Sequence, residues 1–302
     1  MISFFANIFG YVLNFIYNII GNYGLAIIVF SILVKILMIP ISIKQQKTMK
    51  KSTKLNAKLK ELQVKYKNNP EKLNEETMAL YKSENMNPLS GCLSAIVQIV
   101  LLFSVFFLVK SPLTYMKKVD NNVIEKYTQI MKQEELSDSN SGYPEIDLIR
   151  EIENIKTLEN KKEEQQNNNE EEKIDLSEIN QEELDNLYIN MDFFGLNLAQ
   201  VPTKGGDWKS YIIPVLYVLI SVLSMRIANS TMPKVKSEKK DEEEEFDPVE
   251  QMNKNMNLVF PIMYVMIALV APLGLALYWL MNSLLMIVEK LTLNKLLKDE
   301  EE

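Results

Sequence analysis

The chain alternates long apolar blocks with strongly charged blocks, and this pattern predicts a polytopic membrane protein. The first block is residues 23–42, with the sequence YGLAIIVFSILVKILMIPIS, and a spanning helix needs roughly 20 mostly apolar residues. The other blocks are residues 87–109, 211–229 and 258–288. The last would be about 46 Å long as one helix, well over a bilayer core, so we expect Pro272 and Gly274 to divide it. The pattern therefore predicts five spans.

Residues 1–22 carry a thin polar stripe within an otherwise apolar sequence. Asn7, Tyr11, Asn14 and Asn18 recur at helical spacing, which is typical of an amphipathic helix lying in the membrane interface. The segment lacks a basic start and a small-residue cleavage site, which argues against a removable signal peptide. An uncleaved first span is the alternative.

The segment between the first two spans, residues 44–87, is basic. It holds eleven lysines against five glutamates, and basic short loops favour the cytoplasm, so the N-terminus is expected outside. Asn69 followed by Pro70 marks the start of a second helix, which predicts a helical hairpin. This hairpin could bind anionic lipid, ribosomal RNA or a protein, or it could be a solvated face that only fixes topology. The candidate partner-binding residues are Lys50, Lys51, Lys54, Lys58 and Lys65.

Lys35 interrupts the first span and is the first candidate for function. It precedes Lys44 by nine residues, which places it about 13 Å inside the helix end, deeper than its side chain can reach. A cation at this depth costs about 2.5–3.5 kcal/mol and should face protein or a water-filled cavity. The alternative is a simple partner for an acidic side chain on another helix, although the other spans contain no carboxylate before Glu289.

Polar residues also recur at helical spacing on four of the five spans. Single serines or glutamines in membrane helices often bond to their own backbone or to a neighbouring helix. Four stripes together with a buried cation indicate instead a hydrated cavity, and the cytosolic lysines suggest that it opens inward. Such a recess would attract the polar or acidic end of another polypeptide. The candidate groove residues are Ser31, Lys35, Ser94, Gln98, Ser221, Ser224, Tyr278 and Asn282.

Composition excludes most enzyme chemistries. Cys92 is the single cysteine, and the chain has no histidine, which is the commonest acid–base group and metal ligand. The sequence contains no glycine-rich phosphate loop, paired-cysteine motif or nucleophile elbow. We therefore expect no enzyme activity, no cofactor, no metal site and no small-molecule substrate.

The long segment between the second and third spans is acidic and contains an asparagine- and glutamate-rich run. Five apolar residues within it have roughly helical spacing, which predicts a helix before that run: Ile146, Ile149, Ile152, Ile155 and Leu158. The segment offers no chemistry of its own.

These observations predict an all-α polytopic membrane protein with five transmembrane helices around a hydrophilic groove. The expected order is an interfacial helix at 1–22, transmembrane helix 1 at 23–43, a cytosolic basic hairpin at 44–87, transmembrane helix 2 at 88–110, an extracellular acidic loop with an insert at 111–209, transmembrane helix 3 at 210–230, a cytosolic loop at 231–256, transmembrane helices 4 and 5 at 257–272 and 273–291, and a short acidic cytosolic tail at 292–302.

Several motifs in this order resemble the YidC family of membrane protein insertases, which has mitochondrial and chloroplast relatives. They are GLAIIVFSILVKILMIPISIKQQKTMKK, KLKELQVKYKNNPEKLNEETMALYK, NPLSGCL with Gln98, FFGLNLAQVP and APLGLALYWLMN. The resemblance covers residues 20–118 and 191–292. The large folded outer domain of Gram-negative members is missing between the first two spans, which indicates the Gram-positive type.

The resemblance implies a groove that is open to the cytoplasm and the lipid but closed outside, and a hairpin needed for activity. The groove cation, usually arginine and here Lys35, would receive the hydrophilic part of a nascent membrane protein, whose apolar segment then enters the lipid. No nucleotide is hydrolysed. The implied partners are nascent membrane proteins and the phospholipid bilayer, with the Sec translocon and the ribosome as further candidates. The implied location is the bacterial plasma membrane, with the C-terminus cytoplasmic.

Two other function classes are compatible with the same residues. A small anion transporter or channel could use Lys35 as its binding site, although no repeat relates the two halves of the sequence. An assembly scaffold could hold partners through the hairpin without inserting anything.

Overall fold

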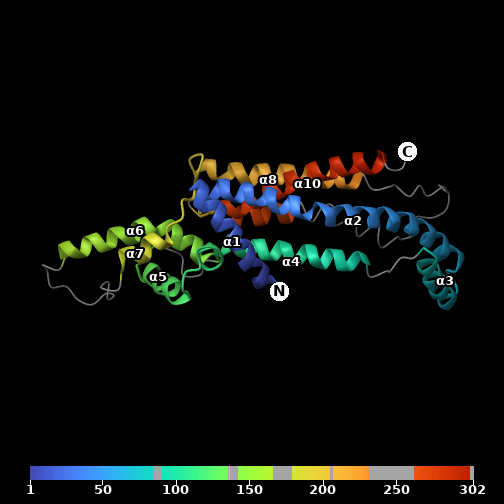
Figure 1. The fold of residues 1–302 in the computed structure, drawn as a ribbon, viewed down its shortest axis with the longest axis horizontal. Helices are drawn as coiled ribbons and strands as arrows, with labels where there is room; N and C mark the ends of the chain where they lie inside the picture. The colour runs from blue at the N-terminus through green and yellow to red at the C-terminus, as the bar shows by residue number, and fades with distance from the viewer. Residues whose placement is uncertain are drawn as a thin grey trace.

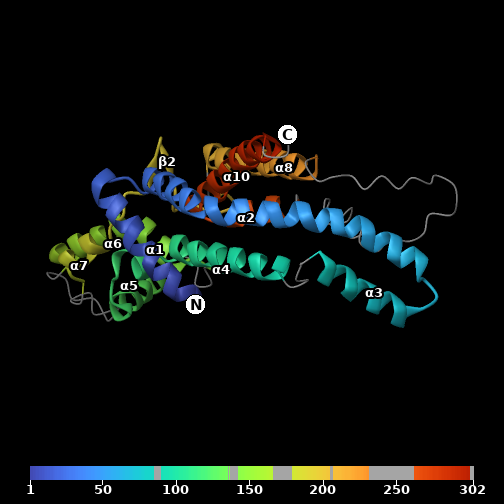
Figure 2. The same ribbon diagram turned by 45° about the vertical axis from the view of Figure 1, so that its right-hand side comes forward.

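Helices make up most of the described structure, and most of the longer ones lie roughly along one long axis (Figure 1). The computed structural model describes residues 1–84, 90–134, 136, 142–165, 179–204, 207–230 and 262–299. A helical bundle occupies the middle, a small helical lobe lies at one end, and the hairpin predicted at 44–87 lies at the other (Figures 1 and 2). The predicted all-α polytopic class is confirmed.

The bundle contains α1 (Ile2–Ile20), α2 (Tyr23–Lys65), α4 (Ser90–Lys110), α8 (Ile212–Ser230) and α10 (Leu273–Asp299). Four described helices are long and apolar enough to cross a membrane, at Ile2–Ile20, Tyr23–Thr48, Trp208–Ile227 and Leu273–Leu293. A shorter apolar stretch, Ile99–Lys110, lies on α4. The Trp279 indole packs on the rings of Phe106 and Tyr217, with centroids 6.5 and 5.8 Å away, and so joins α4, α8 and α10.

A single helix, α2, includes both the first predicted span and the first helix of the hairpin. It runs without interruption for 43 residues and contains Pro40, whose ring nitrogen cannot donate to the preceding turn. The second hairpin helix is α3 (Pro70–Ser83), and Asn69 caps it by accepting from the Lys72 backbone N–H at 3.1 Å. The predicted helix start at Asn69 and Pro70 is confirmed.

The chain breaks just before α10, as the Pro272 and Gly274 pair predicted. A helix covers 262–270, and α10 begins at Leu273. The first N–H groups of a helix have no partner within it. Here the N–H groups of Leu273 and Gly274 donate to the carbonyls of Gln200 and Leu198, both at 2.9 Å.

Those carbonyls belong to a loop that follows a two-residue hairpin turn. Strand β1 (Asp192–Phe193) pairs with β2 (Leu196–Asn197), and both turn residues, Phe194 and Gly195, have positive φ, as a tight hairpin requires. The same segment holds the start of α2, since the Asn190 carbonyl accepts from the Tyr23 N–H at 3.0 Å. One short loop therefore fixes the beginnings of α2 and α10 side by side.

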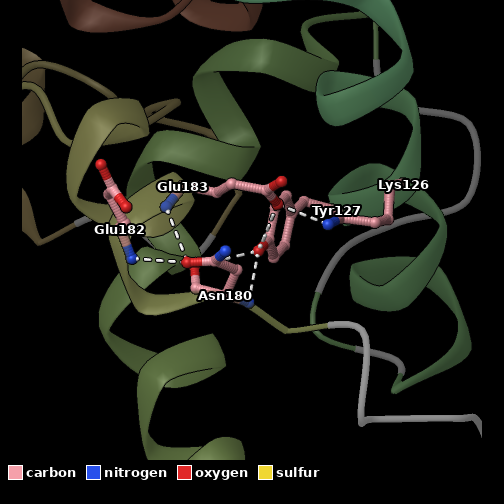
Figure 3. A network of polar contacts seen from close by, with 5 residues as sticks. All are labelled: Lys126, Tyr127, Asn180, Glu182 and Glu183. Carbon is pink, nitrogen blue, oxygen red and sulfur yellow. Dashed lines mark hydrogen bonds and ion pairs between the residues drawn. The ribbon is translucent and has the colours of Figure 1, made fainter.

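The lobe consists of η1 (Leu113–Lys117), α5 (Asn121–Gln133), α6 (Pro144–Gln165) and α7 (Gln181–Leu187). Helix α6 confirms the helix predicted from the isoleucine spacing, and Ile152 and Ile155 are fully buried in the lobe core. A polar network closes the lobe (Figure 3): the Tyr127 hydroxyl accepts from the Asn180 N–H at 2.9 Å and donates to Glu183 at 3.0 Å, and Lys126 pairs with Glu183.

The lobe meets the bundle where α1 crosses η1. A Cβ atom added at Gly10 would lie 1.8 Å from the Tyr115 carbonyl oxygen, so only glycine permits this backbone approach. Helix α1 therefore packs against the bundle and the base of the lobe together.

Candidate groove in the bundle

A cavity of about 410 Å³ lies between α2, α4 and α10. Its lining on α2 extends from Ser31 to Gln45, a span of about 21 Å along the helix axis. It therefore runs from the middle of the apolar stretch to the start of the basic segment, and it is far larger than the space one water molecule needs.

Two walls of this cavity carry the polar groups of its described lining, and the described side chains of the third wall are apolar. Ser31, Lys35, Ser42 and Gln45 line it from α2, and Tyr278 and Asn282 line it from α10. Helix α4 contributes Val97, Ile99, Leu101, Leu102 and Val105. A polypeptide segment in this cavity would meet hydrogen-bonding groups on one side and aliphatic side chains on the other.

Helical periodicity produces this arrangement on α2. Residues three or four apart share a face, so Ser31, Lys35 and Ser42 point toward the cavity. Ile36 and Leu37, on another face, are 59% and 60% exposed and would contact lipid. The Ser31 hydroxyl donates to the Ile27 carbonyl at 2.7 Å, so it is satisfied within its own helix.

The Lys35 ammonium forms an ion pair with the Glu289 carboxylate of α10. Their side chains are 21% and 12% exposed, so water is partly excluded from both. The second carboxylate oxygen of Glu289, Oε1, is buried and has no hydrogen-bond partner among the described residues. The structure thus combines both interpretations of Lys35, because it lines the cavity and also pairs with an acidic residue.

The geometry of the two helix starts explains this pair. Gly274 lies beside the Tyr23 ring, at 3.7 Å from an added Cβ atom, so α2 and α10 begin at the same level. Lys35 is twelve residues along α2 and Glu289 sixteen residues along α10, a difference of about 6 Å in depth. The lysine stem can cover this difference by extending toward the C-terminal end of α2.

Two predicted groove residues lie in a different place. Ser221 and Ser224 are buried on α8, and neither belongs to the lining of the cavity. The Ser221 hydroxyl forms a hydrogen bond of 3.1 Å with the Ser283 hydroxyl of α10, which joins these two helices. The Ser224 hydroxyl is buried with no partner among the described residues. Two further candidates, Ser94 and Gln98, lie on α4, but their side chains are outside the described residues.

The whole chain resembles one known family. A family model described as 60Kd inner membrane protein matches residues 15–301. The chain belongs to the 60Kd inner membrane protein family.

Several relatives that match part of the chain are named membrane protein insertase YidC. The chain is 49% identical over 94 residues to the protein of Syntrophus aciditrophicus, a match that covers 31% of this chain and 17% of that protein. It is 41% identical over 107 residues to the protein of Francisella tularensis subsp. novicida, which covers 35% of this chain and 19% of that protein. Each match therefore spans less than a fifth of the relative's own length. The resemblance in the motifs is confirmed at the level of the family.

In this member of the 60Kd inner membrane protein family, the hairpin of α2 and α3 lies at the end of the molecule opposite the lobe (Figure 2). The side chains of Lys51, Lys58 and Lys65 are exposed, and those of Lys50 and Lys54 lie outside the described residues. Lys58 and Glu84 form an ion pair of 2.5 Å that joins α2 to α3, and the ammonium lowers the pKa of this carboxyl. The Lys65 ammonium lies 5.2 Å from the Tyr66 ring centroid.

The sequence did not identify Glu289 as the partner of the groove cation Lys35. Its signal was visible, because Tyr278, Asn282 and Glu289 fall along one side of the last span and Glu289 is the first carboxylate within the other spans. The pattern could not show where α2 and α10 begin relative to each other along the bundle axis, because the loop at 190–200 determines this. Ser42 shares its face with Lys35, and Gln45 continues that wall toward the basic segment.

Proposed function

We propose that this chain is a membrane protein insertase that receives the hydrophilic end of a nascent membrane segment in the cavity beside Lys35. The observation that carries the proposal is the cavity itself, which has the partly exposed Lys35 cation, hydrogen-bonding groups on α2 and α10, and aliphatic side chains along the described part of α4. The relatives named membrane protein insertase YidC support it. Ser31, Lys35, Tyr278 and Asn282 form the described part of the proposed site. Ser94 and Gln98 remain proposed members of it, whereas Ser221 and Ser224 lie outside this lining and their place in a groove rests on the sequence pattern alone.

The proposed mechanism is physical rather than chemical. A polar flank that enters the membrane alone must give up its hydration, which costs several kcal/mol for a charged group. Within the cavity, the flank would exchange water for Lys35 and the neighbouring amide and hydroxyl groups. Each apolar residue of the attached segment that enters lipid contributes a few tenths of a kcal/mol. The groove therefore lowers the free-energy barrier to moving the polar flank into the membrane. The transfer of the apolar segment into lipid supplies the favourable free energy of insertion.

The proposed orientation follows from the lysines. The basic hairpin would lie in the cytoplasm, with the lobe on the outer side of a bacterial plasma membrane and both the first span and α10 running inward. The five proposed spans are 23–43, 88–110, 210–230, 257–272 and 273–291, with 1–22 at the interface. Exposed lysines of the hairpin would dock an acidic partner surface, for which the Sec translocon and the ribosome are candidates.

The direct test uses purified protein in liposomes. A newly synthesised single-span protein with an acidic flank is added, and its protection from external protease is measured with and without this chain. We expect protection only in the presence of the chain and a roughly tenfold lower rate for Lys35→Ala, since an interaction of about 1.4 kcal/mol corresponds to tenfold. Ile36→Ala, at the neighbouring lipid-facing position, is the matched control and should insert normally.

Other outcomes would support the other function classes. Chloride flux through the same liposomes without protection of the test protein would support an anion transporter. Protection that is independent of this chain, together with partner binding that is lost on hairpin deletion, would support a scaffold. Normal insertion by Lys35→Ala would remove Lys35 from the mechanism.

A further inference from the structure

The cationic position of the groove is already occupied in this structure. The Lys35 ammonium contacts Glu289 Oε2, so a carboxylate of the chain itself fills the position that an incoming acidic group would take. A substrate carboxylate that reaches Lys35 must therefore replace Glu289 or share the lysine with it.

The two members of this pair have unequal access to the cavity. Lys35 belongs to the lining together with Ser31 and Asn282, whereas Glu289 does not. The Glu289 side chain is also the less exposed of the two, at 12% against 21%. Lys35 is therefore accessible from the cavity, while Glu289 contacts it from outside the cavity lining.

The carboxylate of Glu289 is also incompletely satisfied. Its Oε1 atom is buried without a hydrogen-bond partner in the described parts of the chain, although an ionised carboxylate normally accepts several bonds. A pair held at one oxygen gains less from its contact than one with both oxygens bonded. Such a pair can be exchanged when the displaced Glu289 carboxylate takes up a proton or shares the Lys35 ammonium with the newcomer, because an unpaired carboxylate would otherwise remain buried.

We infer that Glu289 is a displaceable internal carboxylate that neutralises Lys35 in the empty groove and competes with the acidic flank of a substrate. This inference rests on the proposed function and adds a selectivity determinant to it. Glu289 keeps the cation paired when no substrate is present, which limits the cost of a lone charge in the bilayer. Glu289 also makes binding selective, since only a substrate flank that carries its own carboxylate can replace it at Lys35.

The structure offers a purely architectural alternative, in which the ion pair serves only to hold α2 against α10. In that case, removal of Glu289 would weaken the protein and reduce binding of all substrates equally. The competition described here has the opposite consequence for one class of substrate, because removal of the competitor frees Lys35 for it.

The experiment measures binding in detergent by fluorescence anisotropy, so that it does not require insertion. Two labelled peptides share an apolar segment of about 20 residues. One has an Asp-Asp-Glu flank and the other an Asn-Asn-Gln flank. For Glu289→Gln, we expect roughly tenfold tighter binding of the acidic peptide and little change for the neutral one, as expected when one charged competitor is removed. Ser283→Ala, also on α10 and outside the cavity lining, is the control for general disturbance of that helix.

A charge exchange separates competition from architecture. The double variant Lys35→Glu with Glu289→Lys restores the ion pair but presents a carboxylate to the cavity. We expect it to favour a Lys-Lys-Arg flank over the acidic one. Equal loss of both original peptides in Glu289→Gln, with full recovery of both in the double variant, would overturn the inference in favour of a structural tie.

The liposome assay distinguishes failure of this inference from failure of the proposed function. Wild-type insertion with an acidic-to-neutral binding ratio unchanged by Glu289→Gln would reject the inference alone. A changed ratio with no insertion by the wild-type chain would reject the insertase function while keeping the exchange at Lys35.

Discussion

The lobe and the bundle both bury apolar side chains with helical periodicity, but α2 of the bundle also turns polar side chains inward and apolar ones outward. On α6 in the lobe, Ile152 and Ile155 are fully buried, and Glu153 between them is 74% exposed. On α2 in the bundle, Ser31 and Lys35 face inward, and Ile36 is among the most exposed residues of the helix. We expect this difference because the apolar helices of the bundle lie in lipid, whereas we propose that the lobe lies in water.

This contrast changes how burial is interpreted. In the lobe, a buried side chain contributes to stability through area removed from water. In a bilayer, lipid is as apolar as leucine, so burial of an apolar residue between helices has no such driving force. Buried polar residues in the bundle therefore indicate either a contact between helices or a binding site. The hydrogen-bond partner of each residue decides between these two roles.

Truncation in the lobe core should give the largest effect. Ile152→Ala leaves a cavity in a fully buried position and should lower the free energy of unfolding of the lobe by about 2–5 kcal/mol. Ile36→Ala removes the same atoms from the lipid-facing side of α2 and should change stability by less than about 1 kcal/mol. Urea unfolding in micelles, followed by proteolysis of the lobe, measures both. Equal losses would show that the two regions do not differ as described.

The junction of the two regions should be sensitive to one methyl group. Gly10→Ala places a Cβ atom against the Tyr115 backbone carbonyl and should cost about 1–3 kcal/mol, because backbone cannot move aside as a side chain can. Hydrogen exchange of η1 should accelerate. Gly142→Ala is the control, since an added Cβ atom there has no neighbour within 4 Å. Unchanged exchange in Gly10→Ala would mean that α1 does not hold the lobe.

Two buried serines of α8 should respond differently. Ser221→Ala removes the hydrogen bond to Ser283 and should destabilise the contact between α8 and α10 by about 0.6 kcal/mol, with about 1.7 kcal/mol as the upper limit for such bonds in membranes. Ser224→Ala removes a buried hydroxyl without a partner among the described residues and should be neutral or slightly stabilising. Thermal unfolding in detergent compares the melting temperatures of the two variants. A larger decrease for Ser224→Ala than for Ser221→Ala would contradict the prediction that only the Ser221 hydroxyl stabilises a helix contact.

The smallest effect is a pH dependence at the base of the lobe. Glu145 is buried and accepts from the Thr114 N–H at 3.0 Å and the Thr114 hydroxyl at 2.7 Å, and burial raises its pKa above the ordinary value of a carboxyl. The folded state then holds this proton more tightly than the unfolded chain. Stability should fall as the pH rises from the ordinary pKa of about 4.3 through the raised value.

Glu145→Gln removes that titration and should flatten the dependence within this window. The melting temperature of the lobe, measured at a series of pH values for both proteins, gives the comparison. Parallel curves for the wild-type protein and Glu145→Gln would show that another group causes the slope.

The sequence predicted the features that are encoded locally. Helices of membrane-spanning length at 23–48, 208–227 and 273–293 follow from apolar length, the start of α3 from the cap at Asn69 with Pro70, and the break before α10 from Pro272 with Gly274. Helix α6 follows from the isoleucine spacing. Each of these depends on neighbours within one or two helical turns, so a single segment contains the information.

Contacts between distant segments could not be predicted in the same way. The pairing of Lys35 with Glu289 depends on where α2 and α10 begin relative to each other, which the loop carbonyls of Leu198 and Gln200 determine. Whether Ser221 faces Ser283 or the cavity depends on the rotation of α8 about its axis. A polar stripe identifies the inward face of a helix but not which inward neighbour it meets.

The continuity of α2 has a mechanical consequence. At 43 residues the helix is about 65 Å long, roughly twice the hydrocarbon thickness, and Lys35 and the hairpin lysines lie on the same rod. Pro40 lies between them and removes one backbone hydrogen bond of α2. The helix should therefore bend most easily at Pro40. A partner that tilts the hairpin would move the part of α2 that follows Pro40. The ion pair of Lys35 lies within two helical turns of Pro40, so this motion would reach it.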